Sequence, residues 1–420
     1  MLRIPPQAAA SKRRWLLSTD FSYVWWGQMV SQVGDGVSKL ALLWFVYSVT
    51  GSPLKTSIIG LLQTVPAIVL APFIGVAVDR LPKKVLLISS DVVRAIVIGL
   101  VPCWLSTETF TVGHLYVLVA LHAIASAVFG PTLTASIPSL VAPTQYTSAN
   151  ALLQTTTSLG IVMGPALSGI GIATLSSQEV LCLNAATYMI SAACFLPVRL
   201  ARPTTHLIRT SAVASTLHDV MEGFRYVVTG QPLFLFLTGT AAFYTFATSA
   251  FTTLFPVFGR KLLDLGPVEV GYLWSMLGLG LLLISLILAS VSAWSVHHRI
   301  QIIAISSVAS GLAMFALVWT KQPVVAGALL SVLGGSIGVL TPIAWGVLQE
   351  LTPPHMLGRT LSFYTMGAMC AAMGGITFFG WVTGYFGVPM TVMAIGFVML
   401  LTAALAGLFG HFVPERSFPS

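Results

Sequence analysis

The chain has 420 residues, of which 56% are hydrophobic and 8% are charged, and its formal net charge is +8. A soluble domain carries about 25% charged residues, so this chain has too few polar side chains to cover its own surface. The composition excludes an ordinary soluble protein and predicts an all-α integral membrane protein.

Twelve apolar runs follow one another, and each is long enough to cross a bilayer as a helix of about 20 residues. The first half holds runs at 24–47, 56–78, 85–105, 113–134, 150–172 and 180–199, and the second half at 233–256, 268–291, 300–319, 323–348, 361–383 and 388–412. We therefore expect a tail at 1–23, a six-helix bundle at 24–200, a linker at 201–231, a second bundle at 232–412 and a tail at 413–420.

The basic residues are unevenly placed between the two sides of the predicted membrane. Fourteen Lys and Arg residues fall in the tails and loops on the side of the amino terminus, and four fall on the other side. Because basic loops stay in the cytoplasm, this bias predicts a multi-pass protein of a bacterial cytoplasmic membrane with both termini inside. The positive charge thus follows from topology, and we expect no nucleic-acid partner.

The first predicted span holds two ionisable residues near its middle. Asp35 and Lys39 are one helical turn apart and can face each other. Pairing would lower the cost of placing each charge in the membrane, and a proton or a cationic solute reaching Asp35 would compete with Lys39. Either the pair couples transport to an ion, or it is a structural pair near the mouth of a cavity.

A charged turn follows the second span, from Gly75 to Lys84. Asp79 ends the helix, and three cations follow it: Arg80, Lys83 and Lys84. An acid there can accept hydrogen bonds from the amino terminus of a neighbouring helix, which would form a latch that opens when the cytoplasmic side opens. The alternative is a basic cytoplasmic loop with a single acid in it.

The third and fourth spans add further ionisable groups. Asp91 and Arg94, three residues apart, are predicted to extend this latch as a charge network, and the alternative is that they pair only with each other. His122 is a titratable residue near the middle of the fourth span. It could carry a proton near neutral pH, or it could be a hydrogen-bonded packing residue.

The fifth span combines small residues with a proline. Gly160 and Gly164 have the spacing that lets helices approach closely, Pro165 bends the helix, and Ser168 and Gly169 complete the motif. This pattern predicts a hinge or a seal between helices, with ordinary close packing as the alternative.

Turn residues repeat at a shift of 211 residues. Pro131 falls on Pro342, Gly164 on Gly375 and Gly169 on Gly380, and three more pairs follow: Gly60 with Gly271, Pro143 with Pro354 and Pro203 with Pro414. Roughly two coincidences would arise by chance. The chain is therefore predicted to be an internal duplication, and two facing membrane halves are typical of solute carriers.

Aromatic residues in the second half are candidates for the wall of a central cavity. They are Tyr244 and Phe246 in the seventh span, Trp274 in the eighth and Tyr364 in the eleventh. Such walls suit bulky apolar solutes, cations included. The alternative is that these rings pack or face lipid.

Cofactor and metal chemistry is not indicated. The four cysteines, Cys103, Cys182, Cys194 and Cys370, have no paired spacing. The chain also lacks a Gly-Lys-Ser/Thr phosphate loop, so any pumping must draw on an ion gradient. We expect no cofactor and no metal site.

The segment from Gly75 to Lys84 resembles the signature between the second and third spans of the major facilitator superfamily, with Pro82 where that family usually has Gly. The Gly160–Gly169 motif resembles the antiporter motif of exporters in that superfamily. The phrases Trp26–Ser31, Asp91–Ala95 and Glu222–Tyr226 resemble the branch that holds macrolide and enterobactin exporters. The resemblance implies two pseudo-symmetric six-helix bundles and alternating access.

The predicted function is therefore secondary active export of an amphipathic small molecule, a drug, siderophore or similar compound, by proton antiport. Its partners would be that solute, protons and membrane lipids, and the protein would act as a monomer without being an enzyme. Three alternatives are open: a lysophospholipid or metabolite transporter of the same fold, a transport-inactive receptor-like relative, and an intramembrane hydrolase. The last rests on Ser336, which lies in a Gly-x-Ser-x-Gly pattern at Gly334–Gly338.

Overall fold

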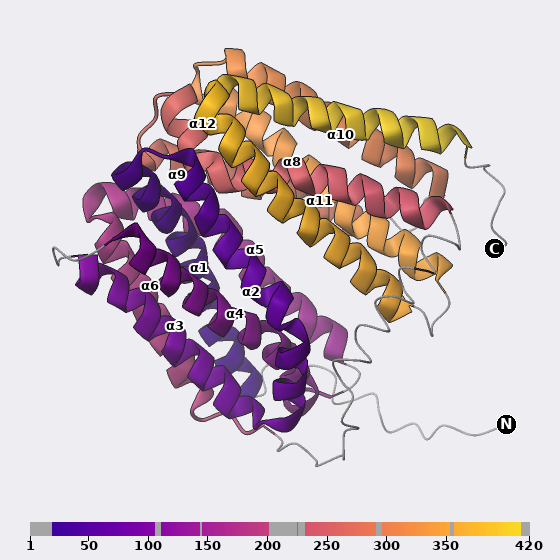
Figure 1. Ribbon diagram of the computed structural model, residues 1–420. Coiled ribbons are helices and arrows are strands. Elements are labelled where there is room, and N and C mark those ends of the chain that lie inside the picture. Colours follow the sequence, from indigo (N-terminus) through magenta and orange to yellow (C-terminus); the bar gives the residue numbers. More distant parts are fainter. Residues whose placement is uncertain are drawn as a thin grey trace, which may run out of the picture.

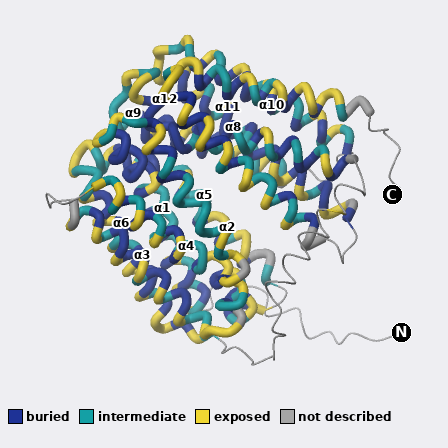
Figure 2. Tube along the Cα trace, in the orientation of Figure 1, coloured by how far each residue is buried: buried dark blue, intermediate teal, exposed yellow. Residues whose placement is uncertain are grey.

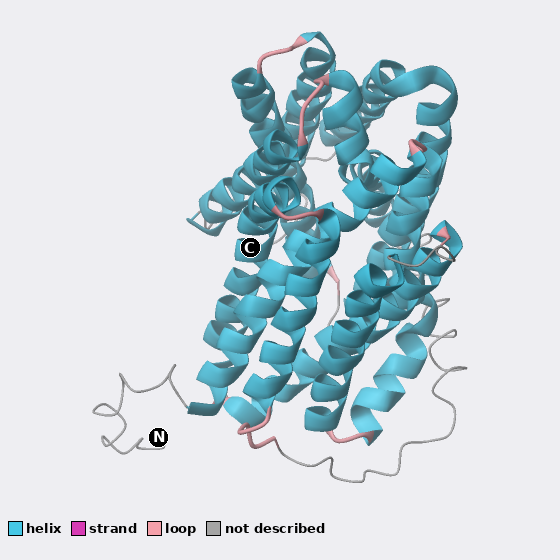
Figure 3. Ribbon diagram, turned by 90° about the vertical axis from the view of Figure 1, so that its left-hand side faces the viewer, coloured by secondary structure: helices cyan, strands magenta, loops and turns pink. Residues whose placement is uncertain are grey.

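A computed structural model of the chain describes residues 19–105, 111–142, 145–200, 225, 232–290, 296–352 and 357–412. Within these residues the regular structure is entirely α-helical (Figure 3). The predicted linker at 201–231 lies almost wholly outside this part of the chain, as does the tail at 413–420. The first helix begins at Thr19, inside the predicted tail at 1–23.

The first group of helices runs from indigo to magenta in Figure 1. It consists of α1 (Thr19–Thr50), α2 (Pro53–Arg80), α3 (Lys83–Leu105), α4 (Val112–Leu140), α5 (Tyr146–Thr174) and α6 (Ser177–Phe195). Prolines and small polar residues set several of these ends. Ser52 caps α2 by accepting from the Lys55 amide, and Ser176 caps α6 by accepting from the Glu179 amide.

The second group runs from red to yellow. It consists of α8 (Pro232–Leu262), α9 (Pro267–Ser290), α10 (Val296–Trp319), α11 (Pro323–Leu351) and α12 (Leu357–Phe412). The last element is two helices that meet at Gly387, where φ is 82°. Glycine adopts this backbone conformation readily, and Pro389 follows at the start of the next helix. With this division the described chain holds twelve helices, which confirms the predicted fold class.

Nine of the described helices are long and apolar enough to cross a membrane, the 56-residue α12 counting once among them. The two others, α1 and α6, pack against each other and carry polar residues such as Asp35 and Asn184. Exposed residues run along the outer sides of both groups (Figure 2). Many of the exposed residues are large and apolar, such as Trp319 at 83% and Val324 at 84%. Such a surface is stable only against lipid.

The duplication is visible in the helix boundaries and in the packing. Helix α11 begins and ends 211 residues after α4, and α12 begins 211 residues after α5. A side chain added at Gly169 would meet Val268 of the second group, whereas one added at Gly380 would meet Ser57 of the first. The same shift relates both partners, so the two groups contact each other through two copies of one interface.

The two groups contact each other on one side of the molecule. We call the end of the bundle where α1 begins the Thr19 face, and the end where α1 stops the Thr50 face. The contacts between groups join α5 to α9, α2 to α12 and α1 to α8, in the half nearer the Thr50 face. In Figure 1 the groups meet at the upper left and separate toward the lower right. The described structure is thus closed at the Thr50 face.

Candidate transport site

A charged cluster lies inside the first group of helices. Arg94 of α3 is almost fully buried, its side chain being 3% exposed. It forms an ion pair with Asp91 on the same helix, and its Nη1 lies 3.8 Å from Oδ2 of Asp35 on α1. Residues three apart share one face of a helix, which places both α3 charges toward α1. Buried charges are stable only when paired in this way.

Two further helices contribute to the cluster through a hydrogen-bonded chain. The hydroxyl group of Tyr188 on α6 donates to the Asp35 carboxylate. Nε2 of His122 on α4 lies 2.8 Å from the same hydroxyl oxygen. A tyrosine has one proton to donate, so with Asp35 ionised His122 donates its Nε2–H to Tyr188. The chain His122, Tyr188, Asp35 therefore connects α4, α6 and α1.

Aromatic rings hold Arg94 in place. Its guanidinium carbon lies 4.2 Å from the centre of the Phe129 ring and 4.4 Å from that of Tyr188. Guanidinium groups are attracted to ring faces at such distances. Tyr188 thus contacts both Arg94 and Asp35, and it was missed by the sequence analysis. The signal was weak: a hydroxyl-bearing ring one turn after the buried Asn184, in an otherwise apolar span.

Asp35 opens into two cavities. One, of about 340 Å³, is formed within the first group, and Asp35 and Arg94 share its wall with polar residues of α1, α4 and α5, namely Gln28, Gln32, Ser126, Thr134, Asn150, Gln154 and Thr157. The other, of about 170 Å³, lies where α1 and α5 meet α9 of the second group. The side chain of Asp35 is 30% exposed, so a proton or a solute in either cavity can reach it.

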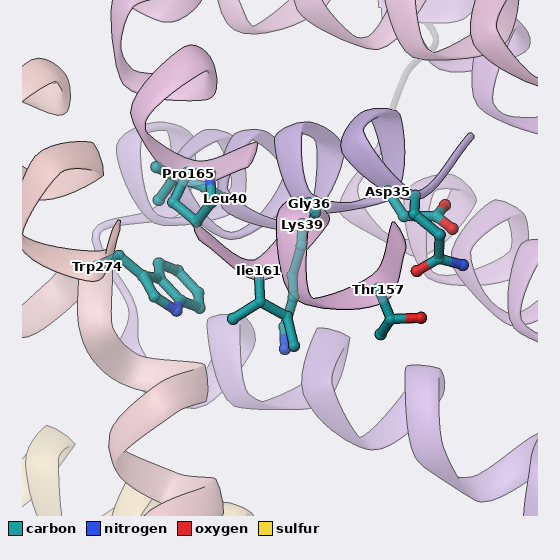
Figure 4. A pocket seen from close by; sticks show the side chains of 10 residues that line it. Asp35, Gly36, Lys39, Leu40, Thr157, Ile161, Pro165 and Trp274 are labelled. Atoms are coloured by element: carbon teal, nitrogen blue, oxygen red, sulfur yellow. The ribbon is translucent and has the colours of Figure 1, made fainter. Parts of the chain in front are cut away.

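Lys39 does not pair with Asp35, which corrects the expectation drawn from their spacing. The carboxylate is engaged by Arg94 and Tyr188 instead. Lys39 extends into the smaller cavity, between Trp274 on one side and Thr157 and Asp35 on the other (Figure 4). Its Nζ lies 5.8 Å from the centre of the Trp274 ring. The two charges therefore share a cavity without forming an ion pair.

The glycines of the fifth span pack α5 against helices of both groups. Side chains added at Gly160 or Gly164 would collide with the backbone of α1 at Gln32 or Gly36, and one added at Gly169 with the backbone of α9. These close approaches require glycine.

Pro165 and its neighbours complete the contact with α9. A proline leaves the carbonyl oxygen four residues earlier without its helical donor, and that oxygen, of Ile161, faces Gly278 of α9. The Ala166 amide donates to Ser275 Oγ over 3.1 Å. Ser168, also in the motif, is fully buried. The motif therefore forms part of the contact that closes the Thr50 face.

The predicted latch can be described only in part, because the Asp79 side chain lies outside the described structure. Helix α2 ends at Arg80, which is exposed, and a side chain at Gly75 would meet no atom within 4 Å. Nζ of Lys83 donates to the Ala135 carbonyl of α4, and Nζ of Lys84 to the Leu196 carbonyl after α6. Both carbonyl groups lie near the carboxyl-terminal end of a helix, where the helix dipole favours a cation.

The two charges farther along α3, Asp91 and Arg94, have partners other than that loop. Asp91 and Arg94 pair with each other, but not only with each other as the alternative had it, because Arg94 also reaches Asp35. Their predicted place in a network with Asp79 is not seen among the described side chains. The latch stays a prediction.

Of the four aromatic candidates, Trp274 lines a cavity beside Asp35. Tyr244 is buried, and its hydroxyl oxygen lies 3.4 Å from that of Ser310. Phe246 packs against the rings of Phe378 and Phe379. Tyr364 is 3% exposed and also lies within the second group. The structure thus separates these three from the polar cluster.

The second half has not kept the residues of the charged cluster, which is therefore confined to the first half. At the shift of 211 residues Asp35 corresponds to Phe246, Arg94 to Ile305 and His122 to Leu333, while Tyr188 corresponds to Met399. Each ionisable or hydroxyl-bearing member is replaced by an apolar residue. The ionisable and hydrogen-bonding residues of the cluster therefore all come from the first half, whereas the second half contributes packing surfaces and Trp274.

Ser336 lies in the middle of a helix. Its Oγ donates to the Val332 carbonyl over 2.9 Å, and Gly334 contacts the backbone of α9 at Leu277. The strand-turn-helix context of a hydrolase nucleophile is not formed by this part of α11. Within the residues that the structure describes, no three His, Cys, Asp or Glu side chains gather into a metal site, and the four cysteines form no disulfide bond.

The fold consists of two related groups of membrane-crossing helices. The ionisable cluster lies in the first group and reaches a cavity between the two groups through Asp35. These features define a polytopic membrane transporter. The family model of the Major Facilitator Superfamily matches residues 24–374. The chain belongs to that superfamily, as predicted from the loop motif at Gly75–Lys84 and the helix motif at Gly160–Gly169.

Its curated relatives include drug exporters. The chain is 25% identical over 391 residues to the multidrug efflux pump Tap of Mycolicibacterium fortuitum, covering 90% of this chain and 92% of that one. It is 24% identical over 359 residues to macrolide efflux protein A of Streptococcus pyogenes, covering 84% and 86%. The resemblance to the drug-exporter branch is thereby confirmed.

Solved structures share the fold at low sequence identity. A bacterial homologue of the iron transporter ferroportin, in an inward-facing state, superposes with a TM-score of 0.73 at 13% identity, covering 94% of this chain and 99% of that one. A bacterial homologue of the lysosomal transporter Spinster, inward-facing and unoccupied, gives 0.70 at 14% identity, covering 96% and 100%. These likenesses concern the fold alone.

Proposed function

We propose that the protein exports an amphipathic small molecule from the cytoplasm in exchange for protons. The observation that carries this proposal is the position of Asp35, an ionisable group inside the membrane region that opens into both cavities. Such groups are costly in a membrane and mark ion or substrate pathways. The printed names of the relatives, a multidrug efflux pump and a macrolide efflux protein, support the direction of transport.

The orientation follows from the charge bias of the sequence. The Thr19 face would lie in the cytoplasm of a bacterial cell, with both termini, and the Thr50 face outside. Lys83 and Lys84 lie near the Thr19 face, where they begin α3. With this orientation the described structure is inward-facing, and the larger cavity receives its solute from the cytoplasm.

Coupling would arise from the alternative partners of Asp35. In the described state its carboxylate is balanced by Arg94 and by the Tyr188 hydroxyl group. A proton that neutralises Asp35 would weaken both contacts and leave Arg94 with Asp91. Solute and proton would then exclude each other at one carboxylate, which is the requirement for antiport. His122, hydrogen-bonded to Tyr188, would be the next group on the proton path.

Alternating access would use the duplicated interface. Closing the Thr19 face would bring the open halves of the two groups together, while the contacts at Gly169 and Gly380 would separate. A single chain contains both groups and the whole site, so we propose a functional monomer in contact with membrane lipids. Rocking of two related bundles about a central site is the general mechanism of such folds.

Two experiments test this function. A panel of drugs and siderophores in an efflux-deficient bacterial host identifies solutes to which the chain confers resistance. Inverted membrane vesicles then measure uptake of one such solute with an imposed proton gradient. We expect uptake that collapses when the gradient is dissipated. Uptake that persists without any gradient, or binding without transport, would favour uncoupled exchange or the receptor-like alternative.

A further inference from the structure

Lys39 occupies a cavity that spans the two groups of helices. The cavity is lined by Gln32, Asp35 and Lys39 from α1, by Thr157 and Ile161 from α5, and by Trp274 from α9. Lys39 lies near the middle of α1, yet its side chain is exposed because it faces this cavity. Figure 4 shows its ammonium group between the indole ring and the hydroxyl group of Thr157.

The charge of Lys39 is not balanced by a carboxylate. Among the described residues the ion pairs of the site join Arg94 to Asp35 and Asp91, and no carboxylate lies within 4.0 Å of the Lys39 amine. Its one charge-type contact is with the Trp274 ring at 5.8 Å, close to the outer limit for a cation–π attraction of about 6 Å. An ammonium group held this loosely inside a membrane protein can accept a strong anionic partner.

Asp35 and Lys39 thus present opposite charges to one cavity without neutralising each other. They are one helical turn apart on α1, which places their side chains on the same face. Asp35 keeps 30% of its side chain exposed even with Arg94 and Tyr188 bound to it. The wall between and beside them is apolar, consisting of Ile161, Pro165 and the Trp274 ring. The cavity is therefore complementary to a dipolar molecule with a flat apolar body.

We propose that the transported solute is a zwitterionic amphiphile, whose acidic group binds Lys39 and whose basic group approaches Asp35. This inference rests on the proposed export function and names its substrate class. The acid would replace the loose contact between Lys39 and Trp274, and the indole ring would stack on the apolar body of the solute. The basic group would compete with a proton for Asp35, so the dipolar solute preserves the exclusion that antiport needs.

The smaller cavity lies between the two groups of helices, so a solute bound there would contact both groups. Lys39 belongs to the first group and Trp274 to the second. A solute held by both would contact both halves at the place where they separate or close. A purely cationic solute would use only Asp35 and would leave the Lys39 charge unbalanced beside it, which disfavours its binding.

A matched set of three probes tests this assignment. Ciprofloxacin is a zwitterion with a flat aromatic body, its methyl ester is a cation, and its N-acetyl derivative is an anion. Binding of each to the purified full-length protein is measured by equilibrium dialysis. Each derivative loses one charge-assisted contact, so we expect the zwitterion to bind at least about ten-fold more tightly than either derivative.

Variants of Lys39 test whether this residue binds the acidic group of the solute. Lys39→Met should weaken zwitterion and anion binding about ten-fold, and it should not weaken binding of the cationic ester, because the unbalanced charge beside that ester is removed. Lys39→Arg should restore zwitterion binding, and Lys55→Met, which removes an exposed lysine from the start of α2, should change nothing. Thermal melting of each variant establishes that it is folded.

Three results would overturn the proposal: unchanged zwitterion binding by folded Lys39→Met, preference of the wild type for the cationic ester, or no binding of any of the three probes. Its failure is distinct from failure of the export function. If a solute of the resistance panel is pumped in a proton-dependent way while folded Lys39→Met binds the zwitterion as tightly as the wild type does, only the substrate class is wrong. If no solute is pumped at all, the export function fails first.

Discussion

Arg94 lies 3.8 Å from Asp35 and at the same time forms an ion pair with Asp91, so one buried guanidinium group connects two carboxylates on different helices. Asp91 is fully buried, whereas Asp35 keeps contact with the cavities. The exposed carboxylate is the one whose charge can change during transport. The buried one keeps Arg94 in place when that happens.

Asp35→Asn tests the role of the exposed carboxylate. The amide cannot exchange a proton, so we expect normal insertion but a loss of gradient-driven uptake in inverted vesicles, by about a hundred-fold or to background, because the coupled step is removed rather than weakened. Asp264→Asn is the matched control. Asp264 is exposed at positive φ, 53°, where asparagine is well tolerated. Gradient-driven uptake at the wild-type rate in Asp35→Asn would remove Asp35 from the coupling mechanism.

Tyr188→Phe removes the hydroxyl group that joins Asp35 to His122 while keeping the ring beside Arg94. A hydrogen bond to a charged group is worth about 1.5–3 kcal/mol, so coupled transport should fall about ten-fold or more. The measurement is initial uptake across a series of external pH values. Tyr23→Phe, on the partly exposed start of α1, serves as the control. A pH profile of Tyr188→Phe that superposes on the wild type would contradict the relay.

Arg94→Met leaves Asp35 and Asp91 without their shared cation inside the protein. Breaking a buried pair from one side is destabilising by about 3–5 kcal/mol, so the variant should unfold at a clearly lower temperature in detergent. Arg299→Met removes the partly exposed partner of the exposed Glu350, 2.7 Å away, and such surface pairs contribute about 1 kcal/mol or less. Equal melting temperatures for the two variants would show that the Arg94 cluster does not stabilise the fold.

Gly169→Val and Gly380→Val should act alike, because the duplication makes them equivalent. Each side chain would collide with the other group of helices, at Pro267 or Ser57. Closure of the Thr50 face should be disfavoured in both. Gly384→Val is the control, since no atom lies within 4 Å of a side chain there.

Access to the cavity is measured with a cysteine placed at Thr157 in a chain without native cysteines. A charged thiol reagent added at the Thr50 face should label this cysteine faster in both glycine variants than in the control. Labelling at the control rate in both would show that these contacts do not close that face.

Much of the fold was predictable, because the signals that specify it are local. Runs of apolar residues set the number of helices, and glycine and proline positions at a fixed shift revealed the duplication. The boundary between the last two spans, at 383–388, falls at Gly387, where the chain turns. The spacing of Gly160, Gly164 and Gly169 likewise predicted close packing, and the structure provides it against two helices.

The site was harder to predict, since its partners come from helices far apart in the chain. Spacing along one helix suggested that Asp35 pairs with Lys39. Inside a helix bundle, however, a charged side chain can also pair with residues of every helix packed around it. Arg94 and Tyr188 reach Asp35 from α3 and α6. Tyr244 and Tyr364 were predicted candidates for the cavity wall, but both are buried within the second group. A sequence alone does not distinguish a ring that faces a cavity from one that packs inside a bundle.

The most direct test of the account is the number of protons released when a solute binds. Purified protein in weakly buffered solution is mixed with a solute identified by the resistance panel, and a pH indicator records the change. If solute and proton exclude each other at Asp35, the wild type should release up to about one proton per bound solute and Asp35→Asn should release none. Binding without proton release in the wild type, or equal release by Asp35→Asn, would contradict the account.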